Sequence, residues 1–226
     1  YIEQAVATYP ELIQGEVDIC NMKKQPLWDE VFESRLRAAD VVLVTNMGVG
    51  LDSPFLERLE RWLYAHHPKY WIDVVEPKKT DILYRNIDEN QRRFLESYRR
   101  TSGVMNYVRL INGAFSIKPI SEWEEPVHIP WQAIMGRDGN IYETYDEFME
   151  AEGNPDWPSI AVYFYRDEWV MGDIEYQQAL FEEIYKHQYN PIIFYGQYGS
   201  NPRVGIPNMK LSMNHLFGKD VFPFDV

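Results

Sequence analysis

Two stretches of this chain alternate between a short apolar strand pattern, an amphipathic helix pattern and a second apolar strand pattern. The clearer stretch predicts a strand at Ile160–Tyr165, a helix at Ile174–His187 and a strand at Pro191–Tyr195. Short runs rich in β-branched and aromatic residues are typical of strands that are buried on both faces. Two such strands joined through a helix run parallel. The pattern therefore predicts a βαβ unit in the C-terminal third of the chain.

A second βαβ unit is predicted nearer the N-terminus. Residues 41–45 read VVLVT, which is typical of a buried strand. Ser53 followed by Pro54 is a helix-start signal, and Phe55–His66 after it is amphipathic. A second short strand is predicted at Trp71–Val75, which completes the unit.

The rest of the chain predicts helices and one long irregular segment. The helices are predicted at Trp28–Ala39, Ile87–Thr101, Tyr107–Phe115, Glu143–Glu150 and Asn208–Leu216. Residues 116–159 contain five prolines, which is typical of a linker or crossover. We therefore predict an α/β fold with two parallel-sheet units of the Rossmann or flavodoxin type, the second complete or cut short at residue 226. The predicted division is a first α/β domain at 1–118, a linker at 119–158 and a second α/β unit at 159–226.

Charge and composition exclude several classes of partner. The formal net charge of −13 repels phosphate backbones and anionic lipids, so we expect neither nucleic acid nor membrane as a partner. No apolar run reaches the ~18–20 residues of a membrane-spanning helix, and the first residues lack a signal-peptide pattern. The single cysteine, Cys20, cannot form an internal disulfide. A reducing compartment, the cytoplasm, is the predicted location.

The most chemically varied segment follows the strand at Ile160–Tyr165. Ligands of open parallel sheets bind outside the carboxyl ends of the strands, and residues 166–173 (RDEWVMGD) form the predicted loop there. An arginine offers a planar set of donors, a tryptophan offers a flat stacking face, and adjacent carboxylates offer acceptors. The predicted ligand-binding residues are Arg166, Asp167, Glu168, Trp169 and Asp173, the last of which also suits a helix cap. An equally open alternative is structural, with the arginine paired to a neighbouring carboxylate and the tryptophan packed over the sheet edge.

The other glycine-containing loop, Asn46–Ser53, is a weaker candidate. Its Gly48-x-Gly50 is a fragment of a dinucleotide fingerprint without the third glycine, and Asp52 would repel a phosphate. A tight turn before a capped helix is the favoured interpretation, and a flavodoxin-like nucleotide or flavin domain is kept as an alternative function. No histidine spacing indicates a metal site, and no nucleophile or P-loop pattern occurs, so no catalytic or metal-binding residue is predicted.

The order of these pieces resembles one protein family. The pieces are residues 39–45 (ADVVLVT), 94–115 (FLESYRRTSGVMNYVRLINGAF), 129–148 (IPWQAIMGRDGNIYETYDEF) and 160–173 (IAVYFYRDEWVMGD). Together they resemble the N-terminal region of the cobaltochelatase large subunit and magnesium chelatase H subunit family. The most specific piece is the Phe164-Tyr-Arg-Asp-Glu-Trp169 run with Gly172-Asp173. The sequence departs from the family where Glu168 replaces a common histidine.

The resemblance implies part of the tetrapyrrole-binding large subunit of an ATP-dependent metal chelatase, not active alone. The substrates would be a tetrapyrrole and Co²⁺ or, as the less favoured option, Mg²⁺. It implies no covalently bound cofactor, and ATP would bind AAA+ ATPase partner subunits. In this interpretation Arg166 faces a propionate or amide side chain and Trp169 lies against the edge of the macrocycle. The alternative is a stand-alone, non-enzymatic module that binds a tetrapyrrole or another protein.

Overall fold

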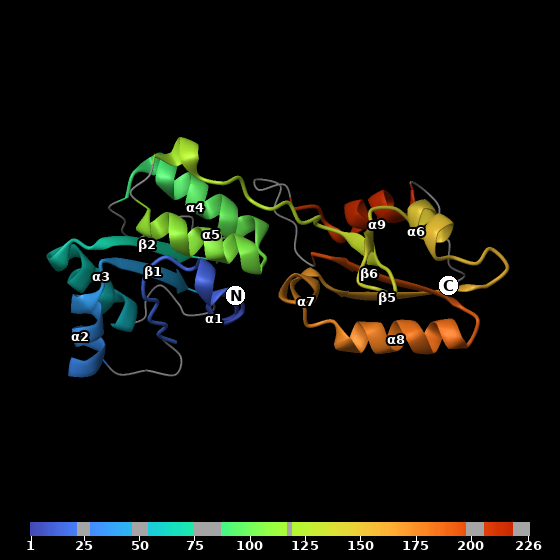
Figure 1. Ribbon diagram of the computed structural model, residues 1–226, viewed down its shortest axis with the longest axis horizontal. Coiled ribbons are helices and arrows are strands. Elements are labelled where there is room, and N and C mark those ends of the chain that lie inside the picture. The colour runs from blue at the N-terminus through green and yellow to red at the C-terminus, as the bar shows by residue number, and fades with distance from the viewer. Residues whose placement is uncertain (22–27, 47–53, 75–86, 117–118, 198–205, 219–226) are drawn as a thin grey trace. The chain divides into compact units, whose positions relative to one another are not determined.

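The computed structural model describes residues 1–21, 28–46, 54–74, 87–116, 119–197 and 206–218. The chain divides into two compact units (Figure 1). The N-terminal unit comprises Ile2–Arg99 and Met105–Pro126. The C-terminal unit comprises Val127–Val226 together with Arg100–Val104 and Tyr1.

The N-terminal unit has a two-stranded parallel sheet covered by helices. Its elements are α1 (Ile2–Thr8), the 3₁₀ turn η1 (Pro10–Leu12), α2 (Glu30–Ala38), β1 (Val41–Asn46), α3 (Pro54–His66), β2 (Lys69–Val74), α4 (Glu89–Thr101), α5 (Val104–Phe115) and η2 (Ile120–Glu122). Strand β1 pairs in parallel with β2, from Val41 opposite Lys69 to Asn46 opposite Val74. The strand–helix–strand order predicted from the sequence is therefore present here.

Apolar side chains pack against both faces of β1, as its apolar sequence predicts. Val44 packs with the apolar side chains of α2 and α3, whereas Leu43 packs against a cluster from α4 and α5. Successive side chains of a strand point to opposite faces, so helices are needed on both sides (Figure 1). The Asp29 side chain accepts a hydrogen bond from Phe32 N at 2.7 Å and thereby caps α2.

The C-terminal unit has a four-stranded sheet in the order β4-β3-β6-β5. Its elements are β3 (Ala133–Met135), β4 (Ile141–Tyr142), α6 (Tyr145–Ala151), β5 (Ser159–Tyr165), α7 (Arg166–Met171), α8 (Glu175–Lys186), β6 (Asn190–Gly196) and α9 (Met209–Phe217). Strands β5 and β6 are parallel, with Ser159 opposite Asn190 and Tyr165 opposite Gly196. Every residue of β6 is buried, because α8 covers one face of the sheet and α6 and α9 cover the other (Figure 1).

The α/β class is confirmed, but this sheet is mixed rather than wholly parallel. Strand β3 runs antiparallel to both β6 and β4. Both added strands lie in segment 119–158, which the sequence predicts to be a linker and which also contains α6. Strands of three and two residues are too short to show a period of their own, and the surrounding prolines conceal them.

The predicted charged loop after β5 is also helical. Residues 166–171 form α7, which ends at Gly172 in the left-handed conformation with φ of 72°. The backbone N–H of Gly172 donates to Trp169 O and that of Asp173 donates to Glu168 O, both at 3.0 Å. The predicted capping role of Asp173 is wrong, because Ile174 occupies the N-cap of α8 and no side-chain cap forms there.

Two successive residues with positive φ separate α4 from α5. Ser102 has φ of 66° and Gly103 has φ of 89°. The helix predicted at Tyr107–Phe115 consequently begins at Val104, directly after this turn. No helix among the described residues is both long and apolar enough to cross a bilayer.

Candidate functional site

The candidate site lies where β5 and β6 end. Phe164 pairs with Tyr195 and Tyr165 pairs with Gly196, so the last residues of the two parallel strands lie side by side. Helix α7 begins at the next residue, Arg166, without an intervening loop. The first turn of α7 is therefore placed at the carboxyl edge of the sheet, where parallel α/β folds bind their ligands.

Arg166 is the largest fully buried side chain described, with 1% of its surface exposed. Its Nε donates to Pro130 O at 2.8 Å, and its Nη2 donates to Thr101 O at 2.9 Å and Ile129 O at 3.0 Å. The guanidinium also lies over the Trp131 ring, with Cζ 4.5 Å from the ring centroid. Arg166 thus links the end of α4 and the segment before β3 to the end of β5.

No carboxylate among the described residues forms an ion pair with Arg166. Burial lowers the pKa of this guanidinium, and only weaker attractions to groups such as Tyr195 and Asp167 oppose that effect. The structural interpretation of this segment predicted that Arg166 would pair with a neighbouring carboxylate. The observed acceptors of Arg166 are backbone carbonyl oxygens instead. The side chain does not reach an exposed surface in this structure, so its predicted contact with a ligand stays a prediction.

Trp169 lies on the same helix and is half-buried. Its ring stacks on that of Tyr195, with centroids 5.8 Å apart and planes at 15°. Tyr195 has no exposed surface, and its ring also makes an edge contact with Phe164 at 5.7 Å. One face of Trp169 is therefore occupied by the sheet, as the structural alternative expects, while part of the indole remains accessible.

The three predicted carboxylates have different surroundings. Glu168 accepts a hydrogen bond from Gln177 Nε2 of α8, which ties α7 to α8. Asp167 and Asp173 are exposed on the outer side of this segment. Among the described residues, no group of three or more His, Cys, Asp or Glu side chains is arranged to hold a metal ion.

Sequence reasoning missed two residues of this site. Tyr195 is the last-but-one residue of β6, and the strand-end rule that selected Arg166 could also have selected it. Trp131 lies in the Pro-rich segment before β3, and no local pattern indicated that it would lie under a guanidinium. The other candidate loop, Asn46–Ser53, lies outside the described residues apart from Asn46.

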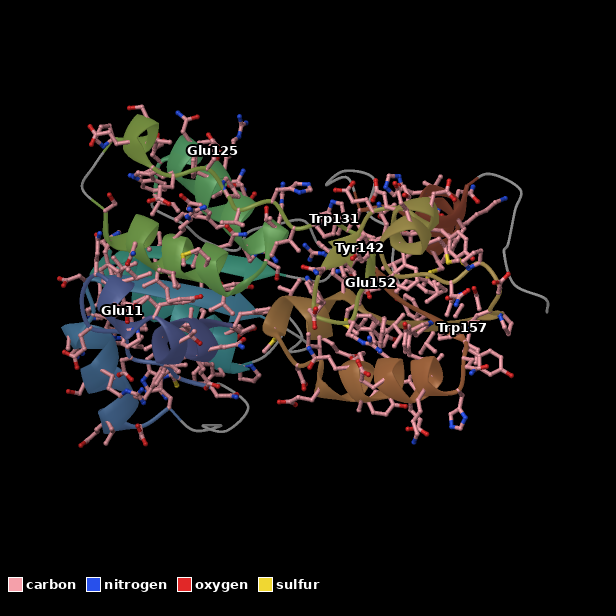
Figure 2. The ribbon with its side chains drawn as sticks, turned by 45° about the vertical axis from the view of Figure 1, so that its right-hand side comes forward. Glu11, Glu125, Trp131, Tyr142, Glu152 and Trp157 are labelled. Atoms are coloured by element: carbon pink, nitrogen blue, oxygen red, sulfur yellow. The ribbon has the colours of Figure 1, made fainter. Side chains whose placement is uncertain are left out.

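A second polar cluster lies at the β3–β4 turn. Glu152 accepts hydrogen bonds from Tyr142 Oη at 2.7 Å and from the backbone N of Arg137 at 2.9 Å, and Figure 2 shows Tyr142 and Glu152 together. A Cβ added at Gly136 would lie 2.2 Å from Glu152 Oε1 and 2.8 Å from Tyr142 Cε2, so a larger residue at this position would displace these two side chains. The Arg137 side chain pairs with Glu182 of α8 at 2.7 Å. These contacts position the two short strands that no sequence period predicts.

Removal of the Glu152 charge should lower the pKa of Tyr142. The hydrogen bond to this carboxylate, with a smaller contribution from burial, raises the pKa of Tyr142 from 10.0 to about 12. The phenol ionises at lower pH in the unfolded chain, so the stabilisation is present below pH 10 and lost as pH rises toward 12. In Glu152→Gln we expect the pKa to return toward 10.0. NMR titration of ¹³C-labelled tyrosine measures it, and an unchanged Tyr142 pKa would contradict the assignment.

Comparison with known proteins places the chain near metal chelatases. A sequence model of the family described as CobN/Magnesium Chelatase matches residues 96–220, which are 125 of the 226 residues. An uncharacterized protein of Methanocaldococcus jannaschii is 29% identical over 146 residues, which cover 62% of this chain and 12% of that protein.

One solved structure, the catalytic subunit of cobaltochelatase from Mycobacterium tuberculosis, matches 79% of this chain and 14% of its own chain. The TM-score is 0.49 and the sequence identity is 18%. The chain thus spans about an eighth of the length of the proteins it matches. The family match includes every element from α5 to α9 and therefore the whole candidate site.

Proposed function

Since the chain belongs to the CobN/magnesium chelatase family, we propose that it forms part of the tetrapyrrole-binding large subunit of an ATP-dependent metal chelatase. The observation that carries the proposal is the position of α7. The family match includes this helix, and α7 places an accessible indole at the carboxyl edge of a parallel strand pair. A flat, apolar macrocycle is the kind of ligand that such a surface favours.

In the proposed complex the macrocycle lies against the exposed part of Trp169. The ring is rigid because its other face stacks on Tyr195, so little side-chain entropy is lost when a ligand binds. Glu168 is held by Gln177, and Arg166 anchors the start of α7 from inside. The helix therefore presents Trp169 in a defined orientation, and Asp167 and Asp173 in the same segment are exposed.

The substrates, metal and partners of the complete enzyme are part of this proposal. The sequence contains no P-loop pattern, so ATP would bind and be hydrolysed on partner subunits of the AAA+ class. Cobalt insertion into a corrin precursor is proposed ahead of magnesium insertion, on the form of the Phe164-Tyr-Arg-x-x-Trp169 run. The metal ion and the macrocycle are both substrates, and this chain supplies binding rather than catalysis.

Porphyrin binding should depend on Trp169. We expect a water-soluble porphyrin with carboxylate side chains to bind at concentrations of about tens of micromolar, and Trp169→Ala to weaken binding about 5- to 10-fold because a stacking contact is lost. The shift of the porphyrin absorption band measures the dissociation constant without using protein fluorescence. Tyr176→Ala is the matched control, because Tyr176 is an aromatic residue of α8 that is 73% exposed.

The binding surface proposal fails if the porphyrin does not bind, or if Trp169→Ala and Tyr176→Ala bind it equally well. The same titration with a corrin in place of the porphyrin compares the dissociation constants of the two classes of macrocycle. Pull-down with the AAA+ subunits then distinguishes a chelatase part, which should bind them, from a carrier module, which should not.

A further inference from the structure

The N-terminal unit contains an open groove that shares no residue with the α7 segment. Its volume is about 580 Å³, within the range of about 300–1,000 Å³ that is typical of ligand sites. One wall is the face of α4 that extends from Asn90 to Ser97, and the other is formed by Ile120, Glu125 and Pro126. All of these residues belong to the same compact unit, so the groove is a feature of this unit alone.

Contacts within the unit hold the two walls of the groove together. The Tyr98 hydroxyl donates to the backbone O of Glu124 at 2.5 Å, and Arg109 Nη1 donates to the backbone O of Glu125 at 2.5 Å. The Phe94 ring, which lines the groove, makes an edge contact with the Trp123 ring, with centroids 5.5 Å apart. Walls that are already fixed lose little conformational entropy when a ligand binds between them.

Each wall carries one charged side chain that can pair with a ligand. Arg93 is 70% exposed and pairs with Glu89 through Nε at 3.2 Å, which leaves Nη1 and Nη2 without a hydrogen bond to a described residue. The side-chain amide of Asn90, one helical turn earlier, also has no described hydrogen-bond partner. On the other wall the exposed carboxylate of Glu125 forms no ion pair or hydrogen bond with a described residue.

The cation lies toward the start of α4 and the anion toward its end. Successive contacts join Phe94 to Trp123 and Tyr98 to Glu124, so the second wall runs in the same direction as α4. Glu125 continues this direction, whereas the lining arginine precedes Phe94 on the helix. A ligand that pairs with both side chains must therefore carry a negative and a positive group that are separated along the groove.

We propose that this groove binds an extended peptide segment of a partner protein, with an acidic residue at one end, apolar residues in the middle and a basic residue at the other end. The acidic residue pairs with Arg93 and Asn90. The apolar side chains pack on Phe94, and the basic residue pairs with Glu125. The wall from Asn90 to Ser97 is about 10 Å long, which about three residues of an extended chain span.

The charge pattern favours this occupant over two others. A second copy of the chain would bring together two molecules that each carry a net charge of −13, which repel each other. A segment with like charges at both ends would meet one repelling side chain, whichever direction it took. The family match begins at residue 96, after Asn90, Arg93 and Phe94, and the proposal does not depend on tetrapyrrole binding.

Fluorescence anisotropy with synthetic peptides tests the charge pattern. The first peptide has the sequence Glu-Leu-Phe-Leu-Lys with blocked ends and a neutral fluorophore, and two further peptides carry Glu or Lys at both ends. We expect the dipolar peptide to bind the full chain about 5- to 10-fold more tightly than either like-charged peptide.

Glu125→Arg should invert this preference. The variant groove presents two cations, so the peptide with Glu at both ends should become the tightest binder, by about 5-fold or more. Glu122→Arg is the matched control, because Glu122 is an exposed acid of the same segment that does not line the groove, and its substitution changes the net charge equally.

Three results would overturn the proposal. The first is equal binding, or no binding, of all three peptides. The second is the same change of preference in Glu122→Arg and Glu125→Arg, which would mean that the peptides respond to net charge alone. The third is sedimentation of the chain as a dimer that dissociates in Glu125→Arg, which would mean that a second copy occupies the groove. The porphyrin titration with Trp169→Ala is independent of all three results.

Discussion

Arg166→Leu is expected to lower the free energy of unfolding of the C-terminal unit by about 3 kcal/mol. The substitution leaves the carbonyl oxygens of Thr101, Ile129 and Pro130 without their shared donor. Each buried acceptor without a partner costs about 1–3 kcal/mol, and removal of an unpaired buried charge offsets part of the total. Arg166→Lys keeps the charge but not the planar fork, so it should recover only part of the loss.

Hydrogen exchange of the β5 and β6 amides in increasing urea measures this effect within the C-terminal unit. Arg137→Leu is the matched control, because its ion pair with Glu182 is solvent-exposed and such pairs contribute at most about 1 kcal/mol. The structural role assigned to Arg166 is wrong if both variants lose the same small amount. Exchange at residues 101–104 gives a second readout, since Thr101 is one of the three acceptors.

Asn190→Ala should destabilise the same unit by about 2–4 kcal/mol. Asn190 is 1% exposed, and its side chain accepts a hydrogen bond from Asn154 N and donates to Asn154 O and Trp157 O. These contacts, all between 2.8 and 2.9 Å, connect the start of β6 to the turn that precedes β5. Their loss removes the side-chain partners of Asn154 N and Trp157 O at the amino end of the parallel pair, while Asn154 O keeps its hydrogen bond from Trp157 N.

Urea unfolding monitored by β6 amide exchange measures this loss, with Asn140→Ala as an exposed control. Asn190→Asp tests the mechanism, because aspartate has almost the same shape but replaces the amide donor with a second negatively charged oxygen. We expect Asn190→Asp to be at least as unstable as Asn190→Ala, since the carboxylate would face two carbonyl oxygens. A stable Asn190→Asp variant would mean that side-chain shape, and not the paired donors, holds the turn.

The sequence predicted those elements whose own pattern is long enough to identify them. The segments assigned to α3, α4, α8, β5 and β6 each carry a helix or strand pattern of their own, and the structure contains each of them. It did not predict β3 and β4, because a strand of two or three residues has no recognisable period and is stabilised by the neighbour that it pairs with. Helix α7 was missed for a similar reason, since six residues are too few for an independent helix signal.

The site illustrates the same limit. The sequence selected Arg166 and Trp169 correctly as residues at a strand end, but their local pattern could not distinguish an exposed guanidinium from a buried one. The three acceptors of Arg166 come from residues 36 to 65 positions earlier in the chain, so its burial depends on contacts that no local pattern contains. Tyr195 belongs to the site because the parallel pairing of β5 and β6 places it beside Phe164, at the end of β5.

The sequence by itself determined that strand, helix and strand follow one another twice, and that a charged, aromatic segment follows the strand now called β5. Hydrophobic periodicity is a local property, so these elements could be predicted from the sequence alone. Only the tertiary structure decided that the second sheet is mixed, that the segment is a helix, and that Arg166 points inward to carbonyl oxygens. Those outcomes follow from pairing backbone donors and acceptors far apart in sequence, since almost every buried polar group in a folded chain must find a partner.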